Sequence, residues 1–209
     1  CELRSRPPEP PPEPMAALCD FHERLLERLA ALPGVEHAGG VSRFPLGSGY
    51  ANGGFLKVRG DEDWSSLDNF GRYIQDKSRA GEGEFRVAST GYFQAMGIPL
   101  MRARLFQQGD VADAPHVALI SESLARAEWP DEDPIGRKVQ FGNMDGDMRV
   151  FTIVGIVGAI RERGPDSRPR PTFYADYRQR PRHTSSFTAV VQGPADAASL
   201  SGAARAALR

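Results

Sequence analysis

The sequence predicts a mixed α+β fold, because stretches with a helical period alternate with short strand-like runs along the chain. Amphipathic helices repeat their apolar residues every three to four positions, whereas strands are short apolar runs bounded by turn residues. In three places one pattern lies directly next to the other. These pairs are a helix at 18–32 with a strand at 35–41, a strand at 117–120 with a helix at 121–129, and a strand at 187–192 with a helix at 196–208.

The first pair follows a proline-rich start. Residues 1–14, CELRSRPPEPPPEP, carry six of the 17 prolines with charges between them. This composition favours extended polyproline conformations and cannot bury apolar surface, so the segment is predicted to be a tether. The helix after it is ended by Pro33-Gly34, and its core-facing stripe is formed by Leu18, Phe21, Leu25, Leu29 and Leu32.

The other two pairs are predicted on the same grounds. Ser121 directly follows the apolar run at 117–120 and is placed to cap a helix that Pro130 ends. A strand followed by a capped helix is a packed α/β unit. The last helix repeats Leu200, Ala204 and Leu208 on one face.

Two stretches of the first half are predicted to be loops. The glycine-rich run PLGSGYANGGF at 45–55 could suggest a phosphate-binding loop, but it lacks both the Gly-Lys-Ser/Thr and the GxGxxG spacing that such loops need. It is followed by FLKVRG, which has the composition of a strand, so a loop is the preferred interpretation. Residues 61–84 are polar and show little periodicity, which predicts a second, longer loop.

A hairpin is predicted between residues 138 and 157, where Asp145-Gly146 separates two β-rich runs. This dipeptide tolerates positive φ at both turn positions. Asn143, Asp145 and Asp147 also resemble half of a calcium-binding loop, but no glutamate follows at the required position, so the hairpin is preferred.

Two glycines interrupt the second strand of that hairpin. Gly155 and Gly158 could mark a close approach of the backbone to a ligand, or a bulge with tight packing between strands. The second interpretation needs no partner and is preferred.

An arginine-rich stretch runs from 161 to 182, where seven arginines face three acids among prolines. With Phe173, Tyr174 and Tyr177 interleaved, it superficially resembles an RNA-binding surface. A solvated, proline-rich connection around one strand, PTFYADY, explains the same residues without a partner.

Composition excludes several classes of function. Lys plus Arg number 26 and Asp plus Glu 27, so the net charge of −1 supplies no positive field for a nucleic acid. The two cysteines, Cys1 and Cys19, support neither a disulfide framework nor a CxxC metal site. The longest strongly apolar run, residues 151–160, has about half the length of a membrane-spanning helix. The first residues do not show the basic stretch followed by an apolar stretch that is expected of a signal peptide.

No catalytic, cofactor-binding or metal-binding residue is predicted, and the chain is not expected to be an enzyme. It contains neither a GxSxG nor an HExxH motif. Cys19 and His22 share a helix face but have no further ligand at metal spacing, and the acid clusters at 61–63 and 131–133 are typical of solvated loops. The histidines are scattered at His22, His37, His116 and His183.

Several blocks in order nevertheless resemble one known family. They are VASTGYFQAMGIPLMRARLF (87–106), Asp110, HVALISESLARAEWPDEDPIGRKVQFG (116–142), FTIVGIVGAIRERG (151–164) and PRPTFYADY (169–177). Their order and spacing resemble the MacB-like periplasmic core domain of ABC-type permeases of the MacB and FtsX kind. The resemblance covers residues 85–177 specifically and 18–45 more loosely. Ala103 departs from the pattern, because the family usually has glycine before the arginine of this block.

The resemblance implies two subdomains and no cofactor. A porter-like subdomain would comprise residues 15–103 together with 185–209, and a smaller inserted α/β subdomain, called Sabre, would comprise 104–184. Since the family usually continues through another strand, the porter-like part is expected to be truncated at its C-terminal end. The family also implies that Asp133 to Gly136 form a turn delivering Val139 and Phe141 into a strand, and that the subdomains meet at Tyr92, Phe93, Met96 and Leu100.

In function, the resemblance implies a non-catalytic periplasmic domain of an inner-membrane permease, lying between its first two transmembrane helices. Its role would be recognition of a substrate or partner and mechanical coupling to those helices. The implied partners are the transmembrane helices of the same permease, a periplasmic adaptor or substrate protein, a separate ATPase subunit and a second copy in a dimer, with no nucleic acid.

Two other functions stay open from the sequence. An extracytoplasmic sensor domain of the same fold would show a preformed apolar pocket with a few convergent polar groups. A hydrolase would show perturbed titratable groups gathered in one cleft.

Overall fold

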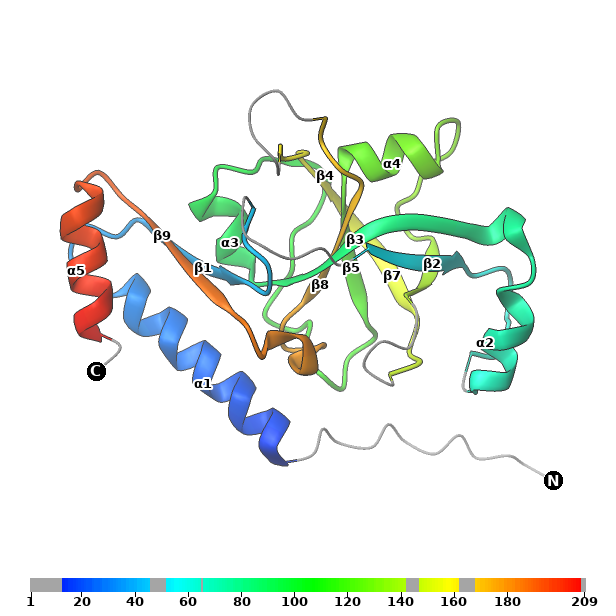
Figure 1. The fold of residues 1–209 in the computed structure, drawn as a ribbon, viewed down its shortest axis with the longest axis horizontal. Coiled ribbons are helices and arrows are strands. Elements are labelled where there is room, and N and C mark those ends of the chain that lie inside the picture. Colours follow the sequence, from blue (N-terminus) through cyan, green and yellow to red (C-terminus); the bar gives the residue numbers. More distant parts are fainter. Residues whose placement is uncertain (1–12, 46–51, 65, 142–146, 162–167, 208–209) are drawn as a thin grey trace.

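The computed structural model describes residues 13–45, 52–64, 66–141, 147–161 and 168–207, and confirms a mixed α+β fold built on one large sheet (Figure 1). The Asp145-Gly146 turn and residues 1–12 of the predicted tether lie outside these ranges, whereas Glu13 and Pro14, the last two residues of the predicted tether, begin the first helix. The helices are α1 (Glu13–Ala30), α2 (Leu67–Tyr73), α3 (Thr90–Ala95), α4 (Glu122–Glu128) and α5 (Ala197–Ala207), with 3-10 turns η1 (Lys77–Arg79) and η2 (Pro181–Thr184). The strands are β1 (His37–Val41), β2 (Asn52–Lys57), β3 (Ala80–Ala88), β4 (Leu100–Ala103), β5 (Val117–Ser121), β6 (Lys138–Phe141), β7 (Phe151–Val157), β8 (Thr172–Asp176) and β9 (Thr188–Gln192).

Six of the strands form a closed ring. The order β2-β6-β7-β5-β8-β3 is closed by an additional pairing of β2 with β3, in which Asn52 lies opposite Glu84 and Leu56 opposite Ala80. The two parallel pairs in the ring are β5 with β7 and β3 with β8, and the remaining neighbours are antiparallel. We call these six strands the ring.

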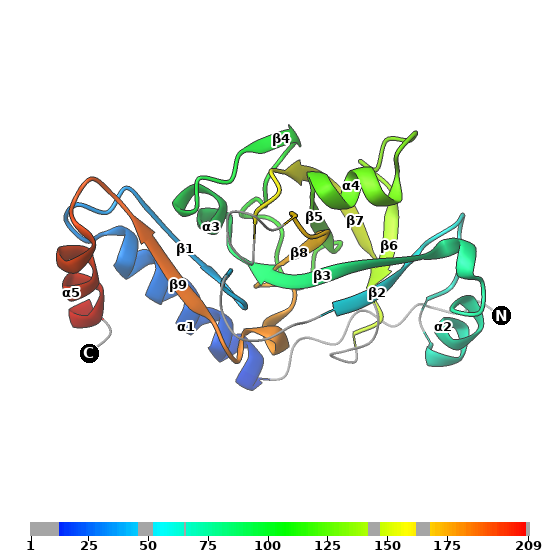
Figure 2. The same ribbon diagram turned by 45° about the horizontal axis from the view of Figure 1, so that its top comes forward.

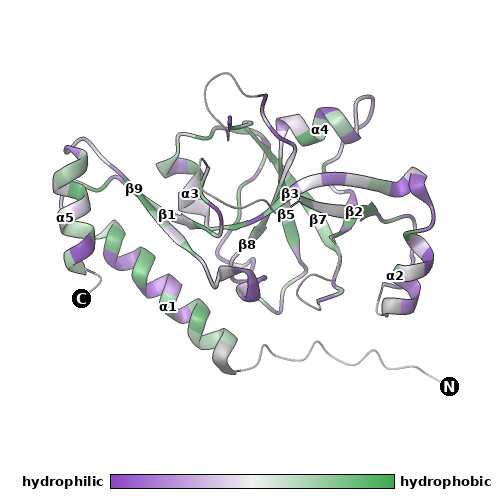
Figure 3. Cartoon of the chain, viewed as in Figure 1, coloured by the Kyte–Doolittle hydropathy of each residue, from purple (hydrophilic) through white to green (hydrophobic). Residues whose placement is uncertain are grey.

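The ring is filled by one face of each strand. Strand side chains alternate between faces, and the inward set includes Phe55, Phe85, Val87, Ala118, Ile120, Val139, Phe141, Phe151, Ile153, Phe173 and Ala175. The aromatic rings stack within it, with Phe141 and Phe173 centroids 4.7 Å apart. Figure 3 shows the hydrophobic residues concentrated on these central strands.

A second core lies on the outer face of β5 and β8. Leu119 and Tyr174 point out of the ring and meet Tyr92 and Phe93 of α3, all with no exposed surface. β5 and β8 are therefore buried on both faces, which agrees with the apolar run VALI in β5 and the apolar centre FYA of β8.

The ends of the described chain form a separate layer. β1 pairs with β9 over five residues, and its register with β3 is Val41 opposite Ala88. α1 lies along one face of β1 with α5 beside it, as Figures 1 and 2 show. On the opposite face α3 approaches so closely that a Cβ at Gly39 would lie 2.0 Å from the Tyr92 nitrogen. We call β1, β9, α1 and α5 the terminal layer.

The predicted strands and helices are found at 37–41, 117–128, 138–157 and 188–207, and the hairpin is confirmed by the pairing of β6 with β7. Gly155 marks tight strand packing, as preferred above, because a Cβ there would lie 2.1 Å from the Arg104 carbonyl oxygen. The register of β5 against β7 also shifts between Ala118 and Leu119.

Several predictions were wrong. Phe21, expected in the core-facing stripe of the first helix, is 53% exposed, and the buried residue beside it is His22. Residues 52–55, expected to belong to the glycine-rich loop, form the first part of β2.

Residues 61–84 are not one loop: they contain α2, η1 and the first half of β3, held by a local cluster of Trp64, Phe70 and Tyr73. Their helix is too short to show a period, but Ser66 caps it. Leu100 was expected to be packed, yet it is 42% exposed on β4, whereas Tyr92 and Phe93 are fully buried and Met96 packs against their cluster.

The turn from Asp133 to Gly136 is confirmed. Gly136 has φ of +83°, and Val139 and Phe141 follow it into β6 as buried residues. Ala103, at the position where the family usually has glycine, has φ of +60°, a left-handed conformation that favours glycine. The departure in sequence is therefore a point of backbone strain.

The predicted division into subdomains at 103/104 and 184/185 remains a prediction. β2 and β3, which fall in the first predicted unit, hydrogen-bond to β6 and β8 of the second.

Candidate coupling site

Three consecutive residues after β8 each bind a different part of the chain. β8 ends at Asp176, and the chain then turns, with the Gln179 and Arg180 amides donating to the Asp176 carbonyl at 3.0 and 3.1 Å. The turn sends the side chains of Arg178, Gln179 and Arg180 in separate directions. We call these three residues the 178–180 hub.

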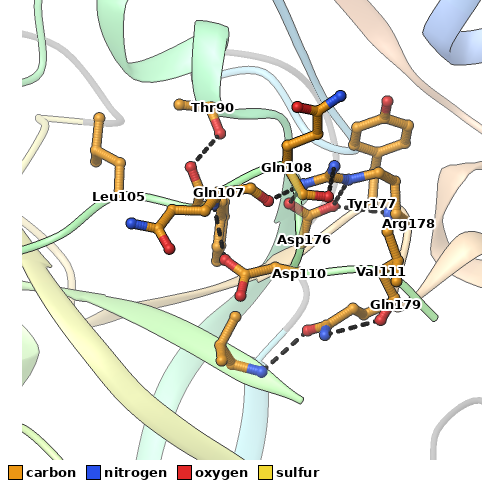
Figure 4. Close-up of polar contacts among 12 residues, drawn as sticks. Thr90, Leu105, Gln107, Gln108, Asp110, Val111, Asp176, Tyr177, Arg178 and Gln179 are labelled. Carbon is orange, nitrogen blue, oxygen red and sulfur yellow. Dashed lines mark hydrogen bonds and ion pairs between the residues drawn. The ribbon is translucent and has the colours of Figure 1, made fainter. Parts of the chain in front are cut away.

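Arg178 joins β8 to the segment after β4 (Figure 4). Its guanidinium makes a bidentate pair with Asp176, at 3.0 Å from Nε to Oδ1 and 2.8 Å from Nη2 to Oδ2. It also donates to the carbonyl oxygens of Gln107 and Gln108, at 2.7 and 3.0 Å. Burial raises the pKa of Asp176, which has no exposed surface, and the Arg178 guanidinium opposes that rise. The hydrogen bond from Arg178 in turn raises the pKa of the guanidinium.

Gln179 is 1% exposed and holds the segment that enters β5. Its Oε1 accepts from the Val117 amide at 2.9 Å, and its Nε2 donates to the carbonyl oxygens of Val111 and Pro115, each at 3.2 Å. A buried amide is costly without partners, so this side chain fixes the path of residues 111–117 (Figure 4).

Arg180 is 2% exposed and holds the segment that enters β7. It donates to the carbonyl oxygens of Asp147 and Arg149, both at 3.1 Å, and its guanidinium lies 4.4 Å above the Phe151 ring. Arg149 adds a link to the neighbouring segment by donating to the Ala112 carbonyl at 2.7 Å.

The far end of the 104–116 segment is tied down separately. The Asp110 carboxylate accepts from Arg104 at 2.7 and 3.1 Å and from the Gln107 amide at 2.7 Å. Burial acts to raise the pKa of Asp110, but these hydrogen bonds outweigh it and hold the pKa below its usual value. Thr90 of α3 donates to the Phe106 carbonyl at 2.9 Å.

α1 contacts the chain on both sides of the hub. His22 of α1 lies 6.4 Å from the Tyr177 ring and 4.4 Å from the Phe187 ring, and Cys19 donates to the Tyr177 carbonyl at 3.9 Å. α1 also contacts η2, which begins directly after Arg180. A path of direct contacts therefore runs from α1 through the hub to the segments that enter β5 and β7.

A cleft of about 670 Å³ opens over those same segments. Its walls are residues 62–64, residues 113–116, and residues 148–150 with Lys138 and Thr152. His116 in the second wall is 3% exposed, and burial first, then the nearby Arg180 and Arg149, lowers its pKa to about 4.

The candidate residues from the sequence fall elsewhere. Cys19 and His22 face the core side of α1, where burial raises the pKa of the Cys19 thiol to about 11 and lowers that of His22. Among the described residues, no three His, Cys, Asp or Glu side chains gather as a metal ion would require. His37 lies on β1, His183 contacts the Phe85 ring, and the acids at 61–63 and 131–133 are at the surface or paired with arginine.

Sequence reasoning missed the hub because arginines among prolines read as solvated. The interpretation of 161–182 as a solvated connection is wrong at its end, where Gln179 and Arg180 are buried, and Phe173, Tyr174 and Tyr177 are buried as well. The sequence did contain one indication, the position of Gln179 and Arg180. They follow within a few residues a strand that is apolar enough to lie in the centre of a sheet. Polar side chains there must find partners in neighbouring segments.

Comparison with known proteins agrees with this architecture. The crystal structure of the periplasmic region of MacB from Actinobacillus actinomycetemcomitans matches with a TM-score of 0.55 and 16% identity, over 90% of this chain and 72% of that one. The extracellular domain of the noncanonic ABC-type transporter YknZ from Gram-positive bacteria matches with a TM-score of 0.50 and 14% identity, over 88% and 78%. At these identities the matches show a shared fold.

A search of curated protein sequences found no match. Within the described ranges, the helices are all too short or too polar to cross a membrane. The family model described as the MacB-like periplasmic core domain matches residues 4–207, which is nearly the whole chain. The chain therefore belongs to the family of MacB-like periplasmic core domains.

Proposed function

We propose that this chain is a periplasmic domain of an ABC-type permease, and that it recognises a substrate or partner and couples that event mechanically to the transmembrane helices of the same permease. Membership of the family supports the setting. The observation that carries the coupling role is the contact path from α1 through the 178–180 hub to the segments that enter β5 and β7.

The hub suits coupling because most of its hydrogen bonds go to backbone groups, and because the side chains of Gln179 and Arg180 that make them are buried. Side-chain bonds to carbonyl oxygens fix the position of a segment whatever its own side chains are. Charge-assisted bonds such as those of Arg178 are also stronger than neutral ones. A displacement of α1 would therefore move the segments around 107–117 and 147–149 with it, instead of being absorbed by loose loops.

In this proposal the chain performs no chemistry of its own. Its partners are the membrane helices of the permease, a separate ATPase subunit, a periplasmic adaptor or substrate protein, and a second copy in a dimer. A second candidate, ligand sensing by the same fold, is favoured by one observation, the preformed cleft of about 670 Å³, two of whose walls the hub holds.

The coupling role can be tested by pulsed electron–electron spin resonance on the full-length permease in membranes with its ATPase. Spin labels at Glu23→Cys on α1 and Ala127→Cys on α4, with Cys1 and Cys19 replaced, report the distance across the hub. We expect one narrow distance with or without ATP and vanadate, and a broad distribution in Gln179→Ala. The exposed Gln94→Ala is the matched control. A distance that already broadens during turnover in the unchanged hub would contradict rigid coupling.

A further inference from the structure

His116, which directly precedes β5, is buried in a site that suits only its neutral form. Its side chain is 3% exposed, and neither ring nitrogen has a hydrogen-bond partner among the described residues. The ring packs against the Phe151 ring, with the centroids 5.4 Å apart. An imidazolium carries two N–H donors and a charge, and burying it without acceptors is far more costly than burying the neutral ring.

The charged groups around His116 also oppose a proton on the ring. The Arg180 guanidinium lies 4.4 Å above the same Phe151 ring, and Arg149 is the second cation that acts on His116. Both guanidiniums already share the Asp147 carboxylate, at 2.6 Å from Arg149 and 3.5 Å from Arg180. Protonation of His116 would therefore add a third positive charge to a group that one carboxylate serves.

The cleft gives a protonated ring a way out of this site. His116 is part of its lining, so a displaced side chain would reach water there. The Ala112 carbonyl oxygen lies close to the ring but outside hydrogen-bond geometry, so it does not hold the ring in place. The other charged residues that line the cleft are Glu62, Asp63, Asp113, Lys138 and Arg149.

A displacement of His116 would act directly on the hub, because Gln179 holds the residues on both sides of it. Gln179 Oε1 accepts from the Val117 amide at 2.9 Å, and Nε2 donates to the Pro115 carbonyl at 3.2 Å. The His116 carbonyl itself accepts from the Thr152 amide of β7 at 2.8 Å. Moving the backbone at 116 therefore strains all three of these bonds.

We propose that His116 is an acid-sensitive switch: a proton on its ring expels the side chain into the cleft, opens the Gln179 bonds to residues 115 and 117, and releases the segment that enters β5 from the hub. This rests on the proposed coupling role and names its regulation. In the closed form burial and the two guanidiniums lower the pKa of His116 to about 4, whereas a freed ring returns to about 6.5. The closed form therefore loses ground to the open form as pH falls from about 6.5 to about 4.

The test is native-state hydrogen exchange on the purified chain, followed by NMR at the Val117 amide, which the Gln179 side chain protects. With the intrinsic pH dependence of exchange divided out, the Val117 protection factor should fall about 20-fold between pH 7 and pH 5. Low concentrations of urea should leave it unchanged, because a local opening exposes little surface. The amide of the fully buried Tyr174 should exchange more slowly and respond to urea.

Three variants assign the effect. His116→Gln keeps a neutral polar side chain and should make Val117 protection independent of pH. Gln179→Ala should remove most of that protection already at pH 7. His22→Gln is the matched control, because His22 is a second buried histidine whose pKa burial lowers, and it should keep the 20-fold fall. Near-ultraviolet circular dichroism shows whether each variant is folded, and the pH profile of the parent chain serves alone if His116→Gln is not.

A Val117 protection factor that stays constant between pH 7 and pH 5, or that falls equally in the parent chain and in His116→Gln, would overturn the switch. Equal urea dependence at Val117 and Tyr174 would assign the exchange to global unfolding and would overturn it as well. The distance measurement in membranes is made at neutral pH, where the switch is closed, so the failure of this proposal and of the coupling role can be told apart.

Discussion

The ring and the terminal layer share one sheet, but their strands differ in how far their residues are buried. Every residue of β5 and β8 in the ring is buried, because the ring is filled inside and α3 covers it outside. In the terminal layer β9 has no fully buried residue and α5 buries only Leu200. The contrast indicates that buried apolar packing is concentrated in the ring, whereas β9 and α5 are held mainly by the pairing of β9 with β1 and by contacts with α1.

The largest effect should come from the ring core. Phe173→Ala removes a fully buried ring that contacts Phe85, Phe141 and Phe151, and should lower the free energy of unfolding by about 4 kcal/mol. Val190→Ala on β9 should cost less than about 1 kcal/mol, because that side chain is only partly buried. Urea unfolding measures both free energies. Similar losses in the two variants would contradict the difference between the ring and the terminal layer.

The hub should rank next. Asp176→Asn removes the fully buried carboxylate that pairs with the partly buried Arg178 guanidinium and should cost about 3 kcal/mol. The control Asp133→Asn affects an exposed pair with Arg102 and should cost less than about 1 kcal/mol. Equal costs in urea unfolding would show that the hub contributes no more than a surface pair.

Acid should weaken the ring through His116. The folded-state pKa of His116 is lowered to about 4, so the unfolded chain binds its proton first as pH falls below about 6.5. The resulting loss of stability develops as pH falls from 6.5 to about 4 and should reach about 2 kcal/mol by pH 4.5. Charged groups facing His116 are Arg180, Arg149 and Asp147.

The contribution of His116 is the difference between the parent chain and His116→Gln. Stability measured by urea unfolding at pH 7 and 4.5 should fall less in the variant. The same fall in both would assign the acid sensitivity to other groups, among them His22, whose pKa burial also lowers.

The smallest effect should be a gain at β4. Ala103→Gly removes the strain of an alanine at φ of +60°, which should stabilise the folded chain by about 1 to 2 kcal/mol. Glycine also increases the conformational entropy of the unfolded chain, which should offset about half of that gain. We expect a net gain of about 0.5 kcal/mol and a melting temperature higher by about 1 to 2 °C. A lower melting temperature would show that the left-handed turn is not strained.

The sequence predicted the elements better than their connections. Periodicity located α1, the cap at Ser121 and the stop at Pro130 located the β5–α4 unit, and Asp145-Gly146 between two β-rich runs located the β6–β7 hairpin. Closure of the ring depends on β2 pairing with residues 80–84 of β3 and with residues 139–141 of β6. These partners are distant from β2 along the chain, so no local pattern indicates the pairing. The hub was not predicted for the same reason, because the role of Gln179 follows from its hydrogen bonds to residues 111, 115 and 117, which are distant along the chain.

The family resemblance supplied what the patterns could not, namely the class of protein. It also drew attention to Ala103, whose φ then explained why glycine is usual there. It did not indicate the cleft, whose walls come from three separated segments of the chain.

The central claim is that the 178–180 hub joins α1 to the segments that enter β5 and β7. Hydrogen exchange read by mass spectrometry on the parent chain, Gln179→Ala and Gln94→Ala tests it most directly. The account predicts faster exchange in Gln179→Ala across 104–117 and 147–150 and in α1, with the rest of the ring unchanged and Gln94→Ala like the parent. Faster exchange confined to residues next to position 179 would contradict it.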